Sequence, residues 1–196
     1  MLCSSNLNIY WGVLIALAVV IVLLIVRTAV YYSCLSKLKK YLFAKDGANA
    51  LKMTKTLKAQ TLMPYQRAAY SVMAAVLMYD GGDKDGCANT LGAVKNKKAA
   101  FAKYYWLTLI DLIDGNLDSA AKHFDEFENS PNVNRVGQSY AEYESRLKTI
   151  MKYKQDGSDE NEVRKIVDSV REINPLYGDT LNKLIVKKDK KSNGGK

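Results

Sequence analysis

His123 is the one histidine of the 196-residue chain, so it is the one side chain that could act as an imidazole base near neutral pH. The same count excludes any metal site built on two histidines. His123 falls between Lys122 and Phe124, in a stretch with helical periodicity. We expect it to be a partly exposed surface residue, neither a catalytic base nor a metal ligand.

Three aspartates, Asp111, Asp114 and Asp118, surround the glycine turn of the segment DLIDGNLD. Such a cluster could hold a divalent cation, but the segment lacks the D-x-D-x-D-G spacing of a calcium loop. A carboxylate pair for hydrolysis would need apolar burial to raise one pKa, and a turn offers none. Asp118 instead suits the N-terminus of the helix that follows, where negative charge is favourable.

Residues 81–86 read GGDKDG, which is rich in glycine but lacks the GKS or GKT ending of a phosphate-binding loop. The segment also follows a predicted helix and not a strand, so we interpret it as a turn. Cys3, Cys34 and Cys87 are too widely spaced for a disulfide framework or a CxxC zinc site. The sequence therefore predicts no catalytic residue, no cofactor and no metal, and favours a protein that is not an enzyme.

An uncharged run over residues 9–26 reads IYWGVLIALAVVIVLLIV. Its length is near the lower limit for crossing the hydrocarbon core of a bilayer, and Arg27 can extend its stem toward the headgroups while the helix continues. Aromatic residues flank the run as an interfacial belt would, namely Tyr10, Trp11, Tyr31 and Tyr32. We predict an uncleaved transmembrane helix over residues 9–32, because residues 1–8 lack basic charge and no signal-peptide cleavage site follows.

Basic residues follow the apolar run and none precede it. The positive-inside rule then places residues 1–8 outside the cell and the remainder of the chain in the cytoplasm. Basic side chains close to a membrane are attracted to anionic lipids. We therefore expect a single-pass plasma-membrane protein whose cytoplasmic interface includes Arg27, Lys37, Lys39 and Lys40. The membrane accounts for much of the net charge of +9, and no base-stacking motif is evident, so no nucleic-acid partner is expected.

Beyond the run, apolar residues recur with helical spacing between glycine-bearing turns such as 80–82 and 114–116. We predict an all-α fold with a domain over residues 33–186 and a disordered basic tail over 187–196. Pro64 suits a first helical turn. After the first helix, which should end near residue 44, the predicted helices cover 48–58, 64–79, 84–94, 99–113, 117–128, 135–154, 159–173 and 176–186.

The segment 104–131, YYWLTLIDLIDGNLDSAAKHFDEFENSP, resembles a tetratricopeptide (TPR) repeat, a pair of antiparallel helices. Thr108 departs from the pattern, which has a smaller residue there. A shift of 33 residues places Cys87 on the position of Ala120, and the resemblance extends loosely over 36–172. It implies an α-solenoid, in which stacked hairpins offer a concave surface to peptides or helices. The matching residues are Tyr104, Leu107, Gly115, Asn116, Ala120, Phe124 and Pro131.

Tyrosines gather on the helices that open the units, and in a TPR-like stack those helices line the concave side. Because successive residues on a helix point about 100° apart, Tyr104, Tyr105 and Trp106 cannot all face one core. At least one of them should be exposed or meet a ligand, and tyrosine is a favoured interface anchor. The predicted contact residues for a partner protein are Arg67, Tyr70, Lys103, Tyr104 and Tyr105.

These features predict a membrane-tethered scaffold or adaptor that holds a partner protein in a helical groove. Two alternatives stay open. One is a structural component of a larger membrane assembly that uses its transmembrane helix for contacts. The other is a membrane-anchored enzyme, for which no polar catalytic cluster is visible. Plentiful lysine, asparagine and tyrosine with three prolines are typical of an AT-rich genome, which points to a low-GC bacterium.

Overall fold

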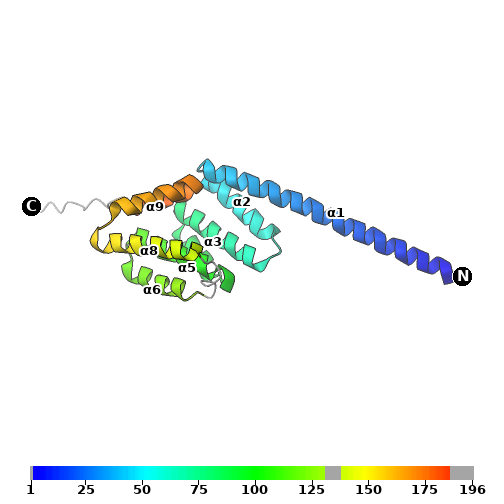
Figure 1. Ribbon diagram of the computed structural model, residues 1–196. Helices are drawn as coiled ribbons and strands as arrows, with labels where there is room; N and C mark the ends of the chain where they lie inside the picture. The colour runs from blue at the N-terminus through cyan, green and yellow to red at the C-terminus, as the bar shows by residue number, and fades with distance from the viewer. Residues whose placement is uncertain (1, 131–137, 186–196) are drawn as a thin grey trace, which may run out of the picture.

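The computed structural model describes residues 2–130 and 138–185, with side chains described over 10–130 and 140–185. All regular structure in these ranges is helical, which confirms the predicted all-α class (Figure 1). Pro131 and the predicted tail over 187–196 lie outside the described residues. The elements are α1 (Leu2–Phe43), α2 (Gly47–Gln60), α3 (Pro64–Asp80), α4 (Lys84–Gly92), the 3-10 turn η1 (Lys97–Ala99), α5 (Ala100–Asp114), α6 (Leu117–Glu128), α8 (Gln138–Asp156), α9 (Glu160–Ile173) and α10 (Pro175–Asn182).

The helix boundaries follow from capping and turn residues that the sequence makes visible. Pro64 is the first residue of α3, where its missing N–H costs no hydrogen bond. Asp46 and Asp83 cap α2 and α4, because each carboxylate accepts a hydrogen bond from a backbone N–H three residues later. Gly115 ends α5 in the left-handed conformation, at φ 83°, which glycine adopts without the strain of a Cβ. Of the predicted helices, α10 differs most, since it ends at Asn182.

Consecutive helices pack on one another, α1 on α2, α2 on α3, α3 on α4, α5 on α6 and α8 on α9. Leucines such as Leu57 and Leu109 fill the space between them and are fully buried. Cys87 and Ala120, which the TPR-like alignment places at the same small-residue position, are also buried. Apolar faces that no single hairpin could cover are therefore covered by neighbouring hairpins.

The C-terminal helix α10 returns to the start of the body and lies against α1, α3 and α5. Leu176 of α10 packs in a cluster with residues of α1, α2 and α3, and the ring of Tyr177 meets Trp106 of α5 edge-on at 5.0 Å. The Asp80 carboxylate accepts hydrogen bonds from Thr180 Oγ1 and Lys183 Nζ, both at 3.0 Å. The chain's own last helix thus covers part of the face of α3 and α5 that the sequence assigned to an open groove.

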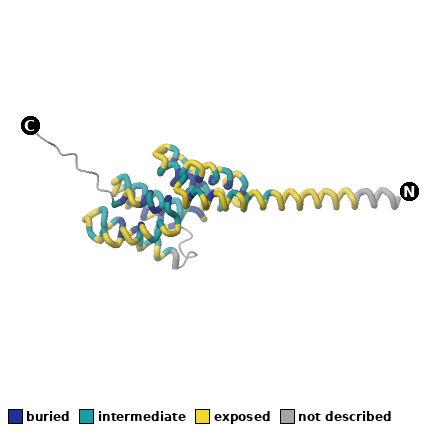
Figure 2. Tube along the Cα trace, turned by 90° about the horizontal axis from the view of Figure 1, so that it is seen from above, coloured by how far each residue is buried: buried dark blue, intermediate teal, exposed yellow. Residues whose placement is uncertain are grey.

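The N-terminal part of α1 stands apart from the body (Figure 2). Every side chain over residues 10–26 is exposed, and contact with the body begins at Arg27, where the uncharged run ends. The segment Tyr10–Phe43 is the one described helix that is long and apolar enough to cross a membrane. The 17 residues from 10 to 26 rise by about 26 Å, close to the thickness of a hydrocarbon core.

Candidate functional site

The five predicted contact residues lie in three different places. Arg67 and Tyr70 are on α3, at the end of the body from which α1 projects. Lys103 and Tyr104 are on α5 and line a groove between α4, α5 and α6. Tyr105 points into the core. The structure therefore brings together two of the five residues as a possible binding surface.

Tyr105 is a core residue, with 6% of its surface exposed. Its ring meets the rings of Tyr143 at 5.0 Å and Trp106 at 5.9 Å, both nearly edge-on. Burial raises the pKa of the Tyr105 hydroxyl, which stays neutral. The helical phase of three adjacent aromatics does not say which one faces inward, and here Tyr105 does, so little of its surface is left for a partner.

The groove between α4, α5 and α6 has a volume of about 760 Å³. Tyr104 and Leu107 supply apolar surface, while Lys103, Lys122 and Glu126 supply charge. A further hollow of about 390 Å³ shares Lys103 and Tyr104 and extends the groove toward η1. The Lys103 ammonium lies 5.1 Å from the centre of the Tyr104 ring, within cation–π range. Burial and the nearby Glu126 carboxylate raise the pKa of the Tyr104 hydroxyl, so this ring is a neutral hydrogen-bonding surface at pH 7.

His123 lies on the wall of the same groove and is about one-third exposed, as predicted. Its Nδ1 lies 2.7 Å from Oδ2 of Asp111, across the α5–α6 hairpin. No pattern in the sequence indicates this pair, which joins residues 12 positions apart on facing helices. The carboxylate fixes the orientation of the imidazole, and the ring centre stands 6.3 Å from that of Tyr104. The pair helps to shape the groove beside Tyr104.

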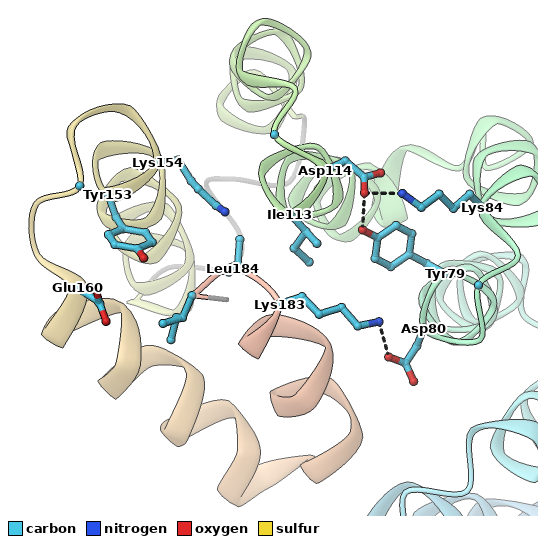
Figure 3. A pocket seen from close by; sticks show the side chains of 14 residues that line it. Tyr79, Asp80, Lys84, Ile113, Asp114, Tyr153, Lys154, Glu160, Lys183 and Leu184 are labelled. Carbon is cyan, nitrogen blue, oxygen red and sulfur yellow. Dashed lines mark hydrogen bonds and ion pairs between the residues drawn. The ribbon is translucent and has the colours of Figure 1, made fainter. Parts of the chain in front are cut away.

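A second hollow, of about 800 Å³, lies where the glycine turns after α3, α5 and α8 come together (Figure 3). Five of its polar side chains bind one another, namely Tyr79, Asp80, Lys84, Asp114 and Lys183. The Asp114 carboxylate accepts hydrogen bonds from the Tyr79 hydroxyl at 2.9 Å and from Lys84 Nζ at 2.5 Å. Figure 3 also shows Lys183 reaching Asp80 on the same side. Burial and the Asp114 hydrogen bond raise the pKa of the Tyr79 hydroxyl. These contacts hold the helix ends together. They give Asp114 a structural role, whereas the sequence predicted a role only for Asp118, at the N-terminus of the helix that follows.

Arg67 and Tyr70 belong to a hydrogen-bonded junction of α1, α2 and α3. The Tyr70 and Tyr31 hydroxyls are 2.6 Å apart, and Arg67 Nε donates to the Thr61 carbonyl at 2.9 Å. Burial and the Tyr31 hydroxyl raise the pKa of Tyr70. Tyr70 therefore helps to fix the angle between α1 and the body, and Arg67 holds the turn between α2 and α3.

The predicted membrane-interface residues also fall into two groups, those exposed on α1 and those in contact with the body. Tyr10, Trp11 and Tyr32 are exposed on α1. Arg27 does not reach freely outward, because its Nε and Nη2 donate to the carbonyl of Gln60, at 3.1 and 2.5 Å. The remaining predicted residues, Tyr31, Lys37, Lys39 and Lys40, lie beyond Arg27 on the same unbroken helix.

The helical rise places Lys37 about 15 Å and Lys40 about 20 Å past Arg27 along α1. Attraction to an anionic leaflet decays within a Debye length of about 8–10 Å. If α1 stands upright, these lysines are beyond the reach of the headgroups. The hairpin instead returns Lys58 and Arg67, at the far ends of α2 and α3, toward the level of Arg27.

Cys87 is a buried residue whose surroundings suppress its reactivity. Burial raises the pKa of the Cys87 thiol to about 11, so the thiol stays protonated and poorly nucleophilic. Over the residues whose placement is described, no three His, Cys, Asp or Glu side chains are grouped to hold a metal ion.

No protein-family model, curated protein or solved structure matches this chain significantly. The class that the chain itself defines is an all-helical body joined to one helix that is long and apolar enough to span a membrane.

Proposed function

We propose that this protein is a membrane-tethered adaptor. Helix α1 anchors it in the plasma membrane with residues 1–8 outside, and the cytoplasmic body, built of TPR-like hairpins, binds a segment of a partner protein. The binding surface is the groove of α4, α5 and α6 beside Tyr104, since α10 covers part of the face predicted from the sequence.

The observation that supports a membrane anchor is the exposure of α1. Fourteen large apolar side chains lie uncovered between Tyr10 and Val26. Burying each is worth about 1.5 kcal/mol or more, so leaving all of them in water forfeits on the order of 20 kcal/mol. That exceeds the whole stability of a typical domain, about 5–15 kcal/mol. A lipid environment removes this cost without any change to the fold.

The partner site has the mixed composition of a protein-binding groove. Tyr104 and Leu107 form an apolar floor, and the charged residues beside it are Lys103 and Lys122 together with Asp125 and Glu126. A peptide segment with one apolar anchor and an acidic residue would match both features. Tethering then holds that partner at a high effective concentration near the membrane.

Site-specific photocrosslinking in living cells tests the proposal. A photoreactive residue at Tyr104 should capture one discrete protein, whereas one at Lys165, exposed on α9, should not. The Lys103→Glu substitution should abolish the capture, and the matched Lys165→Glu substitution should leave it unchanged. The groove assignment would be contradicted if Lys103→Glu left the capture at Tyr104 unchanged, or if position 165 captured as much protein as Tyr104.

Exchange of residues 9–30 for an unrelated transmembrane helix separates the adaptor from a structural component of a membrane assembly. An adaptor needs only attachment, so the capture at Tyr104 should persist. Its loss, with the chimaera still in the membrane fraction, would show that the helix itself makes the functional contacts.

A further inference from the structure

The loop between α2 and α3, residues 61–63, and the first turn of α3 expose an unusual amount of apolar surface. Leu62 is 65% exposed, Met63 60% and Tyr65 48%. Outside α1, the described residues include only two other exposed large apolar side chains, Leu117 and Ile173. Three of these five side chains are therefore gathered in the loop and the first turn of α3.

Hydrogen bonds hold the loop in shape. Arg67 Nε donates to the Thr61 carbonyl, and the Thr61 hydroxyl donates to Gln66 Oε1 at 2.6 Å. Thr61 itself is buried. The backbone is thus turned so that Leu62 and Met63 point away from the body.

Arg27 sets the position of the loop along α1. Its guanidinium donates twice to the carbonyl of Gln60, the residue directly before the loop. Arg27 is also the first charged residue after the uncharged run. The exposed apolar loop therefore lies level with the end of the segment that would cross the bilayer.

The charge around the loop suits an anionic leaflet. Residues 47–79 contain no Asp or Glu, and the four basic residues among them are Lys52, Lys55, Lys58 and Arg67. Lys58 and Arg67 are exposed and flank the loop in sequence. Basic charge beside exposed apolar side chains is the pattern of interfacial membrane contacts.

We propose that the α2–α3 loop inserts Leu62 and Met63 into the interfacial layer of the bilayer that α1 crosses, as a second membrane contact of the body. The proposal rests on the tether of the proposed function. A single helix can tilt in the bilayer and carry the attached body with it, and a second contact fixes that tilt and so the face that the body turns to the cytoplasm. The groove beside Tyr104 is then presented in a fixed orientation to partners.

Fluorescent labels on single cysteines of the full-length chain test the loop. The background carries Cys3→Ser and Cys34→Ala, and Cys87 stays because it is buried. An environment-sensitive label such as NBD is placed at Met63→Cys or at Ile173→Cys. Ile173 is the matched control, because it is exposed and apolar but ends α9, just before α10, which the Lys45–Asp179 ion pair ties to the α1–α2 turn at the other end of α2.

The proteins are reconstituted in vesicles of phosphatidylcholine and phosphatidylglycerol, and iodide is added as an aqueous quencher. The Met63→Cys label should shift its emission to shorter wavelength and lose iodide quenching, while the Ile173→Cys label should be quenched freely. A third label, at Val20→Cys in the uncharged run, should be protected because α1 lies in the bilayer.

The outcomes separate the loop from the tether. Iodide quenching at Met63→Cys equal to that at Ile173→Cys, with Val20→Cys protected, would overturn the loop proposal and leave the tether standing. Free quenching at all three positions would overturn both. Protection at Met63→Cys that disappears when the protein is diluted in lipid would assign the loop to a second copy of the chain, which also overturns the lipid contact.

Discussion

The Gly178→Ala substitution tests the packing that closes the body. Gly178 is a buried residue of α10, and a Cβ built on it would lie 2.4 Å from Cβ and 2.5 Å from Cα of Arg171 on α9. The second of these atoms belongs to the backbone, so no change of rotamer can relieve the contact. The matched control is Gly92→Ala, at the end of α4, where a Cβ would meet nothing within 4 Å.

The expected effects of the two substitutions have opposite signs. Overpacking of this kind costs about 1–3 kcal/mol, and replacing a helical glycine by alanine returns about 0.5–1 kcal/mol. Gly178→Ala should therefore lower the free energy of unfolding by about 1–2 kcal/mol. Gly92→Ala gains the preference of a helix for alanine over glycine without the steric cost, so it should raise the free energy of unfolding by about 0.5–1 kcal/mol.

Thermal unfolding of the full chain in detergent micelles, followed by circular dichroism, measures both variants. In a domain of this size 1 kcal/mol shifts Tm by about 2–4 °C, which the method resolves. The predicted order of Tm is Gly92→Ala, then wild type, then Gly178→Ala. A Gly178→Ala protein at least as stable as the Gly92→Ala protein would refute the close approach of α9 and α10.

Two further substitutions test how α10 is held against the rest of the body. Asp80→Ala removes the acceptor shared by Thr180 and Lys183 and should cost about 1–2 kcal/mol in the same melting experiment; an unchanged Tm would mean that these contacts add nothing. The second substitution, Asp179→Asn, tests pH dependence: the Lys45 ammonium holds the pKa of the Asp179 carboxyl below its ordinary value of 3.8. An ion pair that lowers the pKa of a carboxyl in the folded state stabilises the protein at pH values above the pKa of the unfolded state. This stabilisation is lost as the pH falls through the folded-state pKa. The wild type should therefore exceed Asp179→Asn in Tm at neutral pH and converge with it in acid. A gap that is constant with pH would contradict this ion pair.

Local sequence signals were sufficient for the helices. Caps and turns act over three or four residues, so Pro64 and Gly115 marked boundaries that the structure confirms. Burial of Cys87 and Ala120 also followed from their shared small-residue position in the TPR-like alignment.

These local signals could not predict contacts between segments that are distant in the sequence. The bond from Arg27 to Gln60 spans 33 positions, and the bond from Thr180 to Asp80 spans 100. Neither has a periodic pattern in the sequence. The burial of Tyr105 could not be predicted for a related reason, because the inward direction of α5 depends on where α8 packs.

The orientation of the chain in the membrane is the most direct test of the tethered adaptor. A membrane-impermeant maleimide is added to intact bacterial cells that express the full chain with Cys34→Ala and Lys165→Cys. The native Cys3 precedes α1's uncharged run, and position 165 is exposed on the body. Cys3 should react in intact cells, and the cysteine at 165 should react only after permeabilisation. Labelling at position 165 without permeabilisation would contradict a cytoplasmic body held by a membrane-spanning α1.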